Sequence, residues 1–237
     1  LTIPIHFHNL ALRLNPMKKT IFFFFLIVSV MLAFEAEAQR KTYVGLKGGY
    51  NLSTAYFFHS FFGSDINTKM NGGYQGGIIA MNYIRNHIGL QAELIYTQKG
   101  WTQEFDDGSP NLVTDINYIE LPLLVNIHTG KEKLHFFANA GCFFEYLASS
   151  SQSEVPDYQA NVYAFDESRD HKLGYGFRGG VGAFYDFDFG TLLLESSVSY
   201  SLSDLLEFES LNSGIPNTSK NIVIGFSVAY LFSFGEL

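Results

Sequence analysis

Hydrophobic and polar residues alternate along most of the chain after residue 38. In the last segment, large apolar side chains occupy every second position from Ile224 to Phe232, and small or polar residues such as Ser227 lie between them. Successive side chains of a β-strand point to opposite faces, so this pattern predicts a two-faced strand. No stretch of this region keeps a period of 3.6 residues, which would indicate a helix. The region is therefore predicted to be all-β.

Eight segments carry this alternation or an extended apolar pattern. They are residues 42–55, 73–83, 87–101, 114–128, 133–149, 173–188, 190–205 and 219–234. The fifth is apolar at both sets of alternating positions, which leaves its register open. Short turns and long polar loops alternate strictly between the segments, and this arrangement is typical of an outer-membrane barrel. The sequence predicts an all-β fold, an eight-stranded antiparallel up-and-down transmembrane β-barrel with short periplasmic turns and long extracellular loops.

The composition favours a membrane barrel over a soluble one. Only 16% of the 237 residues are charged, against about 25% in average chains. A soluble lipocalin-like binding barrel, the alternative at the level of the fold, would enclose its large apolar residues and expose many more Lys and Glu. The net charge of -8 argues against nucleic-acid binding, which needs a basic surface. A lone cysteine, Cys142, excludes a disulfide framework.

Residues 17–38 have the layout of a secretory signal peptide. A basic start at Met17-Lys18-Lys19 is followed by an apolar run from Ile21 to Phe34 and by the small-residue motif Ala36-Glu37-Ala38. The apolar run is shorter than the ~20 residues that a transmembrane helix needs. We expect cleavage after Ala38, a barrel domain over residues 39–237, and a true start at Met17, so that residues 1–16 reflect a start assigned too far upstream.

A few charged residues lie on the polar faces of the predicted strands, where a membrane barrel would place them in its interior. They are Lys47, Glu93, Glu120, Arg178 and Glu195. Isolated charges inside a narrow barrel cost several kcal/mol each unless they are paired. We interpret these residues as a salt-bridged structural plug, with a proton or ion path as the functional alternative. Because eight strands leave an interior just wide enough for side chains, an open pore is not expected.

Two further motifs have a structural interpretation. Gly174, Gly176 and Gly179 have the GxGxxG spacing of dinucleotide-binding proteins, but that motif works only between a strand and a helix. Because no helix is predicted after it, we interpret these glycines as small residues in a tightly curved strand. Pro122 lies within a predicted strand and lacks the N–H group of the ladder, which predicts a bulge or local bend.

No catalytic, cofactor or metal site is predicted. Enzyme sites need a nucleophile and a base within reach of each other. His59 is followed by Ser60 in a predicted outer loop, but no carboxylate is patterned around this pair. Since some eight-stranded outer-membrane barrels modify lipid, a lipid-modifying enzyme stays an alternative.

The predicted long loops are acidic, and their only basic residues are Lys69, Arg169 and Lys172. Their acidic residues are Asp65, Glu104, Asp106, Asp107, Asp115, Glu154, Asp157, Asp166, Glu167, Asp170, Glu207 and Glu209. A solvated surface is the simplest interpretation. Bridging of lipopolysaccharide by divalent cations, which prefer oxygen ligands, and docking of a basic protein partner are the functional alternatives. The aromatic residues of the first loop, Tyr56-Phe57-Phe58 and Phe61-Phe62, predict anchoring at the membrane interface.

The chain also resembles a known family. The resemblance is carried by the segments from Val44 to Ser53, from Tyr118 to Leu124, Gly180-Val181-Gly182, Leu194-Glu195, Tyr200-Ser201-Leu202, and from Gly225 to Phe232. On these residues the chain is similar, over residues 42–234, to the Bacteroidota PorT-like outer-membrane β-barrel domain family. The resemblance implies an outer-membrane location and, for some members, a part in protein secretion or surface assembly, without catalytic residues.

We therefore expect a monomeric, non-enzymatic barrel in the outer membrane, in contact with outer-membrane lipids and lipopolysaccharide. Its expected role is a scaffold, assembly or surface-interaction role. A small-solute channel is the first alternative and would need a less obstructed interior.

Overall fold

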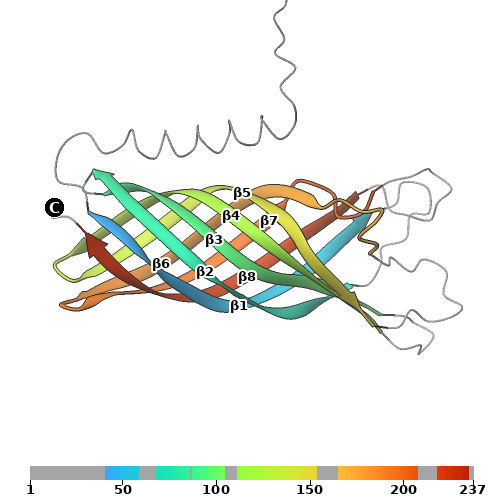
Figure 1. The fold of residues 1–237 in the computed structure, drawn as a ribbon. Coiled ribbons are helices and arrows are strands. Elements are labelled where there is room, and N and C mark those ends of the chain that lie inside the picture. The colour runs from blue at the N-terminus through green and yellow to red at the C-terminus, as the bar shows by residue number, and fades with distance from the viewer. Residues whose placement is uncertain are drawn as a thin grey trace, which may run out of the picture. The chain divides into compact units, whose positions relative to one another are not determined.

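The computed structural model describes residues 41–58, 68–85, 87–104, 111–153, 165–207 and 218–234. These residues form eight β-strands (Figure 1). The strands are β1 (Thr42–Phe58), β2 (Thr68–Arg85), β3 (Ile88–Gln103), β4 (Leu112–Lys131), β5 (Leu134–Gln152), β6 (Leu173–Phe187), β7 (Gly190–Ser201) and β8 (Thr218–Phe234). The predicted signal peptide and the segment before it lie outside the described residues.

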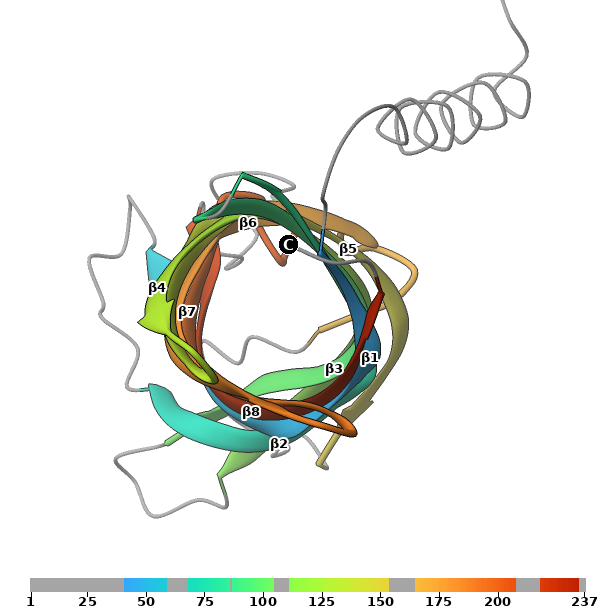
Figure 2. The same cartoon turned by 90° about the vertical axis from the view of Figure 1, so that its left-hand side faces the viewer.

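The eight strands close into one barrel. Each strand pairs antiparallel with its neighbours in the chain, and β1 pairs with β8 from Thr42↔Phe234 to Phe58↔Thr218. Seen along its axis, the sheet forms a continuous ring (Figure 2). Closure removes the unpaired edges that an open sheet would present to lipid. The predicted eight-stranded antiparallel up-and-down barrel is confirmed.

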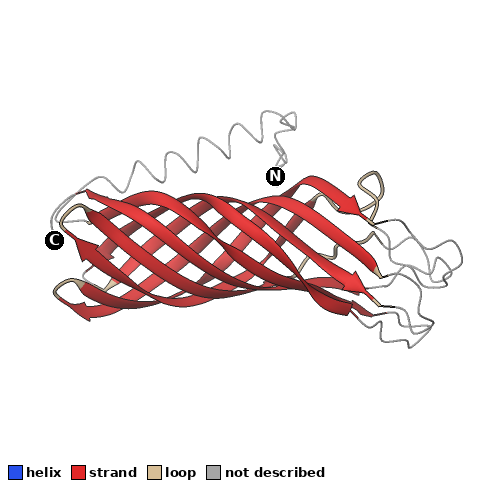
Figure 3. Ribbon diagram, turned by 90° about the horizontal axis from the view of Figure 1, so that it is seen from below, coloured by secondary structure: helices blue, strands red, loops and turns tan. Residues whose placement is uncertain are grey.

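Short turns gather at one end of the barrel, where the described chain also begins and ends. Residues 86–87, 132–133 and 188–189 connect β2 to β3, β4 to β5 and β6 to β7. The strand ends that the longer connections join lie at the opposite end, and strands are the only regular elements among the described residues (Figure 3). No helix in the described part of the chain is long and apolar enough to cross a membrane. The predicted alternation of short and long connections is confirmed.

The strands differ from the predicted ranges mainly toward the long connections. β2 begins at Thr68 instead of residue 73, and β5 ends at Gln152 instead of residue 149. The prediction that the seventh strand continues to residue 205 was wrong, since β7 ends at Ser201. The chain leaves the wall there because the backbone N–H groups of Leu205 and Leu206 donate to the Ser219 hydroxyl at 3.0 and 2.9 Å.

The outer face of the barrel is apolar and the inner face is polar. Leu46 is 69% exposed, whereas its neighbour Lys47 is 4% exposed. The same contrast recurs on β6, where Phe177 is 60% and Arg178 is 4% exposed. Large apolar side chains exposed all around a closed sheet are the surface that lipid covers. This orientation contradicts the soluble lipocalin-like alternative.

Pro122 interrupts the hydrogen-bond ladder of β4 without moving the strand. It pairs with Phe143 of β5 with no shift of register. On the other side, the pairing of β3 with β4 omits residues 93–94 and 121–122 and then resumes in the same register. A proline has no N–H to donate, which accounts for the gap. Of the predicted bulge or local bend at this position, the bulge was wrong, because the register shift of β4 and β5 lies between Asn117 and Tyr118.

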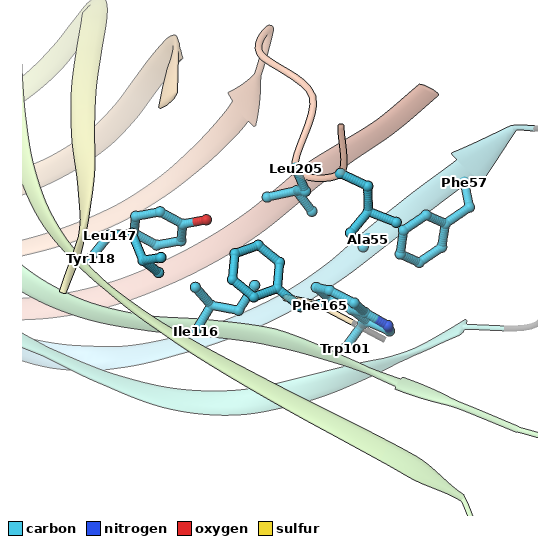
Figure 4. Close-up of a cluster of buried hydrophobic side chains, with 9 residues drawn as sticks. Ala55, Phe57, Trp101, Ile116, Tyr118, Leu147, Phe165 and Leu205 are labelled. Atoms are coloured by element: carbon cyan, nitrogen blue, oxygen red, sulfur yellow. The ribbon is translucent and has the colours of Figure 1, made fainter. Parts of the chain in front are cut away.

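Two apolar clusters fill the ends of the interior. The turn-end cluster consists of Tyr43, Ile79, Met81, Tyr83, Phe137, Phe184, Leu193, Ala229 and Leu231. The loop-end cluster consists of Ala55, Phe57, Trp101, Ile116, Tyr118, Leu147, Phe165, Leu205 and Leu206 (Figure 4). Buried charged residues occupy the layer between the two clusters. The barrel is therefore filled with side chains along its length.

At the end of the barrel that carries the long connections, the wall is shorter at β6 and β7 than elsewhere. Pairing of β5 with β6 ends at Tyr146↔Leu173, and pairing of β7 with β8 ends at Tyr200↔Ile222. Residues 165–172 and 202–207, which we call the stopper, bond to the strand edges left there. The Ser150 N–H donates to the Glu167 carboxylate at 2.7 Å. The stopper contributes three side chains of the loop-end cluster and so closes this end of the interior.

Candidate functional site

The structure brings together the five charged residues predicted for the interior. The Lys47 ammonium lies 2.7 Å from a Glu93 carboxylate oxygen and 2.9 Å from one of Glu195. The Arg178 guanidinium lies 3.1 Å from Glu120, and 4.0 and 3.9 Å from Glu93 and Glu195. Each of the five residues is at most 4% exposed. Alternation along five different strands thus converges on one buried ion-pair network.

Two members of this network were not among the predicted site residues. Lys99 of β3 lies 2.5 Å from Glu120 and 2.6 Å from Glu145 of β5. Lys99 shares the polar face of its strand with Glu93, so the alternation of β3 contained a signal for it. Glu145 lies in the strand whose register the sequence left open, and only the pairing of β5 shows that it points inward.

The network connects six of the eight strands and carries a formal negative charge. Its cations are Lys47, Lys99 and Arg178, and its carboxylates are Glu93, Glu120, Glu145 and Glu195. These seven residues come from β1, β3, β4, β5, β6 and β7. Removing a charge from water costs several kcal/mol, which is recovered only when pairing and hydrogen bonding are nearly complete. Four carboxylates against three cations leave one negative charge in excess.

Neutral polar side chains extend the network toward the turn-end cluster. The Gln91 side-chain amide donates to Glu93 at 2.6 Å, and the Asn126 amide donates to Gln91 at 2.9 Å. The Tyr83 hydroxyl, which belongs to the turn-end cluster, donates to Asn126 at 3.1 Å. The Tyr83 ring then packs against His128, with ring centres 4.3 Å apart, and against Tyr43, whose hydroxyl donates to Asp186 at 3.3 Å. Polar groups therefore continue from the network to the turn end of the barrel.

The glycines of the GxGxxG spacing lie within β6 and are followed by a turn and β7. Their structural interpretation is confirmed. A Cβ atom on Gly176 would lie 2.2 Å from the Tyr200 carbonyl oxygen and 2.7 Å from the ring of Phe143. Gly182 is covered by the ring of Phe137 in the same way. Large inward rings of β5 thus occupy the space that side chains on β6 would need.

At the loop end, Asp170 organises the stopper. Its carboxylate is the acceptor for the backbone N–H groups of Asp166 and Glu207 at 2.8 and 3.0 Å, and it pairs with Arg169 at 2.8 Å. Asp170 is 4% exposed, so these bonds are shielded from water. One carboxylate thereby joins the connection before β6 to the connection after β7.

The other described acidic residues of the loops have separate partners. Glu104 pairs with Lys69 at 2.6 Å, and Asp115 accepts a hydrogen bond from Asn71 at 2.6 Å. Hydrogen bonds from Ser168 hold the pKa of the exposed Asp166 carboxyl below its usual range. Within the described residues, no three His, Cys, Asp or Glu side chains converge as metal ligands. Asp65, Asp106, Asp107, Glu154, Asp157 and Glu209 lie outside the described residues.

The residues considered for catalysis are not part of the buried network. His59 and Ser60 lie outside the described residues. His171 is exposed in the stopper, and Cys142 is half-buried on β5. The charged residues of the interior compensate one another, because each cation of the network pairs with at least two carboxylates.

Aromatic side chains mark both borders of the outer apolar face. Six of the exposed tyrosines, each on a different strand, lie at or beyond the middle of the strand counted from the short turns. They are Tyr50, Tyr74, Tyr96, Tyr146, Tyr175 and Tyr200. Phe187 and Phe189 stack at the short-turn end, with ring centres 5.3 Å apart. Of the first-loop aromatics, Tyr56 and Phe58 are exposed and Phe57 is buried, while Phe61 and Phe62 lie outside the described residues. Two such girdles border the hydrocarbon layer in outer-membrane barrels.

Solved structures of outer-membrane proteins resemble this barrel. OprG from Pseudomonas aeruginosa is 12% identical, with a TM-score of 0.52, over 82% of this chain and 97% of its own. Ail, the attachment invasion locus protein of Yersinia pestis, is 14% identical, with a TM-score of 0.40, over 81% and 99%. The outer membrane protease OmpT from Escherichia coli is 8% identical, with a TM-score of 0.38, over 84% and 99%. The likeness to OprG supports the fold, and no curated protein matches the chain in sequence.

A family comparison gives the same result from the sequence. The model of the outer membrane protein beta-barrel domain matches residues 17–207, which is most of the chain. The inside-out faces, the aromatic girdles and the closed eight-stranded sheet agree with this match. The protein is located in the outer membrane, and the chain belongs to the family of outer membrane protein beta-barrel domains.

Proposed function

We propose that the protein is a closed, non-conducting and non-enzymatic barrel that presents its long connections at the cell surface as a scaffold, assembly or surface-interaction protein. The observation that carries this proposal is the filled interior. An apolar cluster occupies each end, and the ion-pair network occupies the layer between them. Water and ions need a continuous polar path, and both clusters consist mainly of apolar side chains.

Conductance in planar bilayers tests the proposal. The refolded protein, inserted as single barrels, is expected to give no discrete current steps. A variant with Leu205→Ser and Leu206→Ser serves as a comparison, because it weakens the loop-end cluster while leaving the strands unchanged. Reproducible steps from the unmodified protein would favour the small-solute channel and refute a closed scaffold.

A lipid-modifying enzyme is the second alternative, and its one candidate pair is His59 with Ser60. Mass analysis of lipid A and phospholipids from cells with and without the protein tests it. We expect identical lipid masses in the two cell populations. A mass difference that disappears in a His59→Ala variant would establish an enzyme.

The resemblance to the PorT-like family supports a finer proposal, in which the barrel assists protein secretion or surface assembly. Its acidic surface would then contact a basic partner protein, and the barrel would act as a monomer among outer-membrane lipids and lipopolysaccharide. The exposed acidic side chain of Glu207 in the stopper is available for this contact. Comparing secreted and surface proteins of a deletion strain with those of the complemented strain is the test, and a Glu207→Gln variant shows whether this charge matters.

A further inference from the structure

A furrow crosses the lipid-facing surface of the barrel. It is a shallow, open depression with a volume of about 740 Å³. Its floor is the backbone of a row of inward-pointing residues that pair across five strands, from Phe137 of β5 through Gly182, Glu195 and Ser227 to Gly49 of β1. In a pleated sheet, an inward row leaves a valley on the outer face.

Small side chains deepen this valley. One wall runs along Phe136, Ala183, Leu194, Val228 and Gly48, which pair in a single cross-strand row. Ala183 and Gly48 leave openings between the larger members of this row. The lining is apolar except for a single side-chain hydroxyl, which belongs to a residue of the opposite wall.

The opposite wall is formed by Val181, Ser196 and Phe226. Ser196 lies in the middle of β7, which has 12 residues, close to the ~9–11 residues that cross the hydrocarbon layer. The furrow is therefore at membrane depth, where its surroundings are hydrocarbon. Val181 and Phe226 are 61% and 51% exposed, so the walls stand free to contact an occupant.

The furrow has the length and slope of one acyl chain in one leaflet. Five strands spaced about 4.8 Å apart give it a length of ~19 Å. Strands tilted by roughly 40° make the furrow rise about 12 Å along the barrel axis, and one leaflet of a ~30 Å hydrocarbon core is ~15 Å deep. A chain lying in the furrow would thus keep close to its natural depth in the bilayer.

The lower end of the furrow identifies the leaflet. Phe136 is two residues from the start of β5 and lies beside the turn that holds Lys133, whereas Gly48 is six residues from the start of β1. Short turns are periplasmic in barrels of this class, so a chain enters from the periplasmic leaflet, which consists of phospholipid. The Lys133 ammonium is half exposed beside this entry and has three donors for one partner, Asp188 at 2.8 Å.

We propose that this furrow binds one acyl chain of a periplasmic-leaflet phospholipid and holds it as a specific, slowly exchanging ligand. The occupant is a glycerophospholipid whose headgroup lies at the turn between β4 and β5. The apolar lining excludes a polar solute, and the position at membrane depth excludes a soluble peptide.

The test is the phospholipid content of the purified full chain. Protein extracted from outer membranes and washed extensively in mild detergent is analysed by mass spectrometry for lipid per barrel. The unmodified protein is expected to retain about one phospholipid. Ala183→Leu with Ser196→Leu fills the furrow and should lower retention at least tenfold. Ala80→Leu with Ala92→Leu is the matched control, because these alanines also face outward and pair with each other on β2 and β3, outside the furrow.

Each other outcome overturns the proposal. Retention that is absent in the unmodified protein, or equal in the filled and control variants, shows that no chain is held there. Retention of lipopolysaccharide in place of phospholipid refutes the assigned leaflet. A dimer that the filled variant converts to monomers shows that a second copy occupies the furrow.

If the filled variant does not fold, nuclear Overhauser contacts in phospholipid nanodiscs decide the same question on the unmodified chain. The Ala183 methyl should show persistent contacts to acyl protons that Ala92 lacks, and equal contacts at both methyls would refute a specific site.

Discussion

Lys47 of β1 and Glu195 of β7 form an ion pair of 2.9 Å although β8 lies between their strands. The pair is possible because β8 presents small inward residues at this level. Ser227 lies beside Glu195 in the register, and Ala229 lies beside Lys47. The long side chains of Lys47 and Glu195 can therefore meet across the inner face of β8. The small residues of β8 thus make room for an ion pair between its two neighbouring strands.

Replacing Lys47 by Met is expected to destabilise the barrel strongly. The change leaves Glu93 and Glu195 buried without their ammonium partner, and breaking a buried pair costs about 3–5 kcal/mol. Urea unfolding in lipid vesicles measures the loss. Lys133→Met is the control, because its pair with Asp188 is solvent-exposed and worth at most about 1 kcal/mol. Equal losses in the two variants would contradict a structural role of the network.

Neutralising Glu145 is expected to cost far less than neutralising its partner. Glu145→Gln removes the excess negative charge of the network and leaves Lys99 paired with Glu120 at 2.5 Å. Lys99→Met leaves Glu145 without its cation and Glu120 with Arg178 alone, and it should lose about 3–5 kcal/mol. The same unfolding experiment compares them, and a glutamine variant as unstable as the methionine variant would show that the charge count does not govern stability.

Gly176 and Gly179 should respond differently to the same substitution. A Cβ atom on Gly176 would overlap the Tyr200 carbonyl and the Phe143 ring, whereas on Gly179 its nearest neighbour is the Asn139 carbonyl oxygen at an ordinary 3.6 Å. Gly176→Ala is expected to cost about 1–3 kcal/mol through overpacking, and Gly179→Ala little. The shift between boiled and unboiled samples on gels, followed against temperature, ranks the two. Loss of folding in Gly179→Ala alone would refute this account.

Asp170→Ala is expected to loosen the stopper without unfolding the barrel. The change removes the acceptor shared by the Asp166 and Glu207 backbone N–H groups and by Arg169. Limited digestion of intact cells with trypsin, which cleaves after Arg169 and Lys172, should become faster. Glu207→Gln keeps the backbone bond to Asp170 and serves as the control. Unchanged digestion in Asp170→Ala would mean that the apolar side chains alone hold the stopper.

The sequence predicted the strands of the barrel wall better than the side chains that fill the interior. Alternation is local, so it located the inward face of β3 and with it Glu93. The position of Glu145 depended on the register of β5, whose phenylalanines occupy both faces, Phe143 inside and Phe144 outside. Such a strand has no periodic signal, and its orientation is fixed only by pairing with its neighbours.

The stopper was beyond prediction for a related reason. The outward apolar alternation of β7 ends at Leu202, and no sequence pattern shows that Leu205 and Leu206 then enter the interior. That change of direction depends on Ser219, which is 14 residues further along the chain and accepts the Leu205 N–H. The same holds for Phe165, whose place in the loop-end cluster depends on Gln152 across the connection.

The ion-pair network also constrains how the protein can enter the membrane. Lys47 is in the first strand, yet its partners are in β3 and β7, so a hairpin of β1 and β2 would carry an uncompensated ammonium into hydrocarbon. The cationic partners of Glu195, Lys47 and Arg178, likewise lie on β1 and β6 and not on β8, the strand that follows it. Stepwise insertion of hairpins would therefore meet an electrostatic barrier at each step. We therefore expect the chain to insert while the barrel closes, so that the charged side chains pair as they leave water.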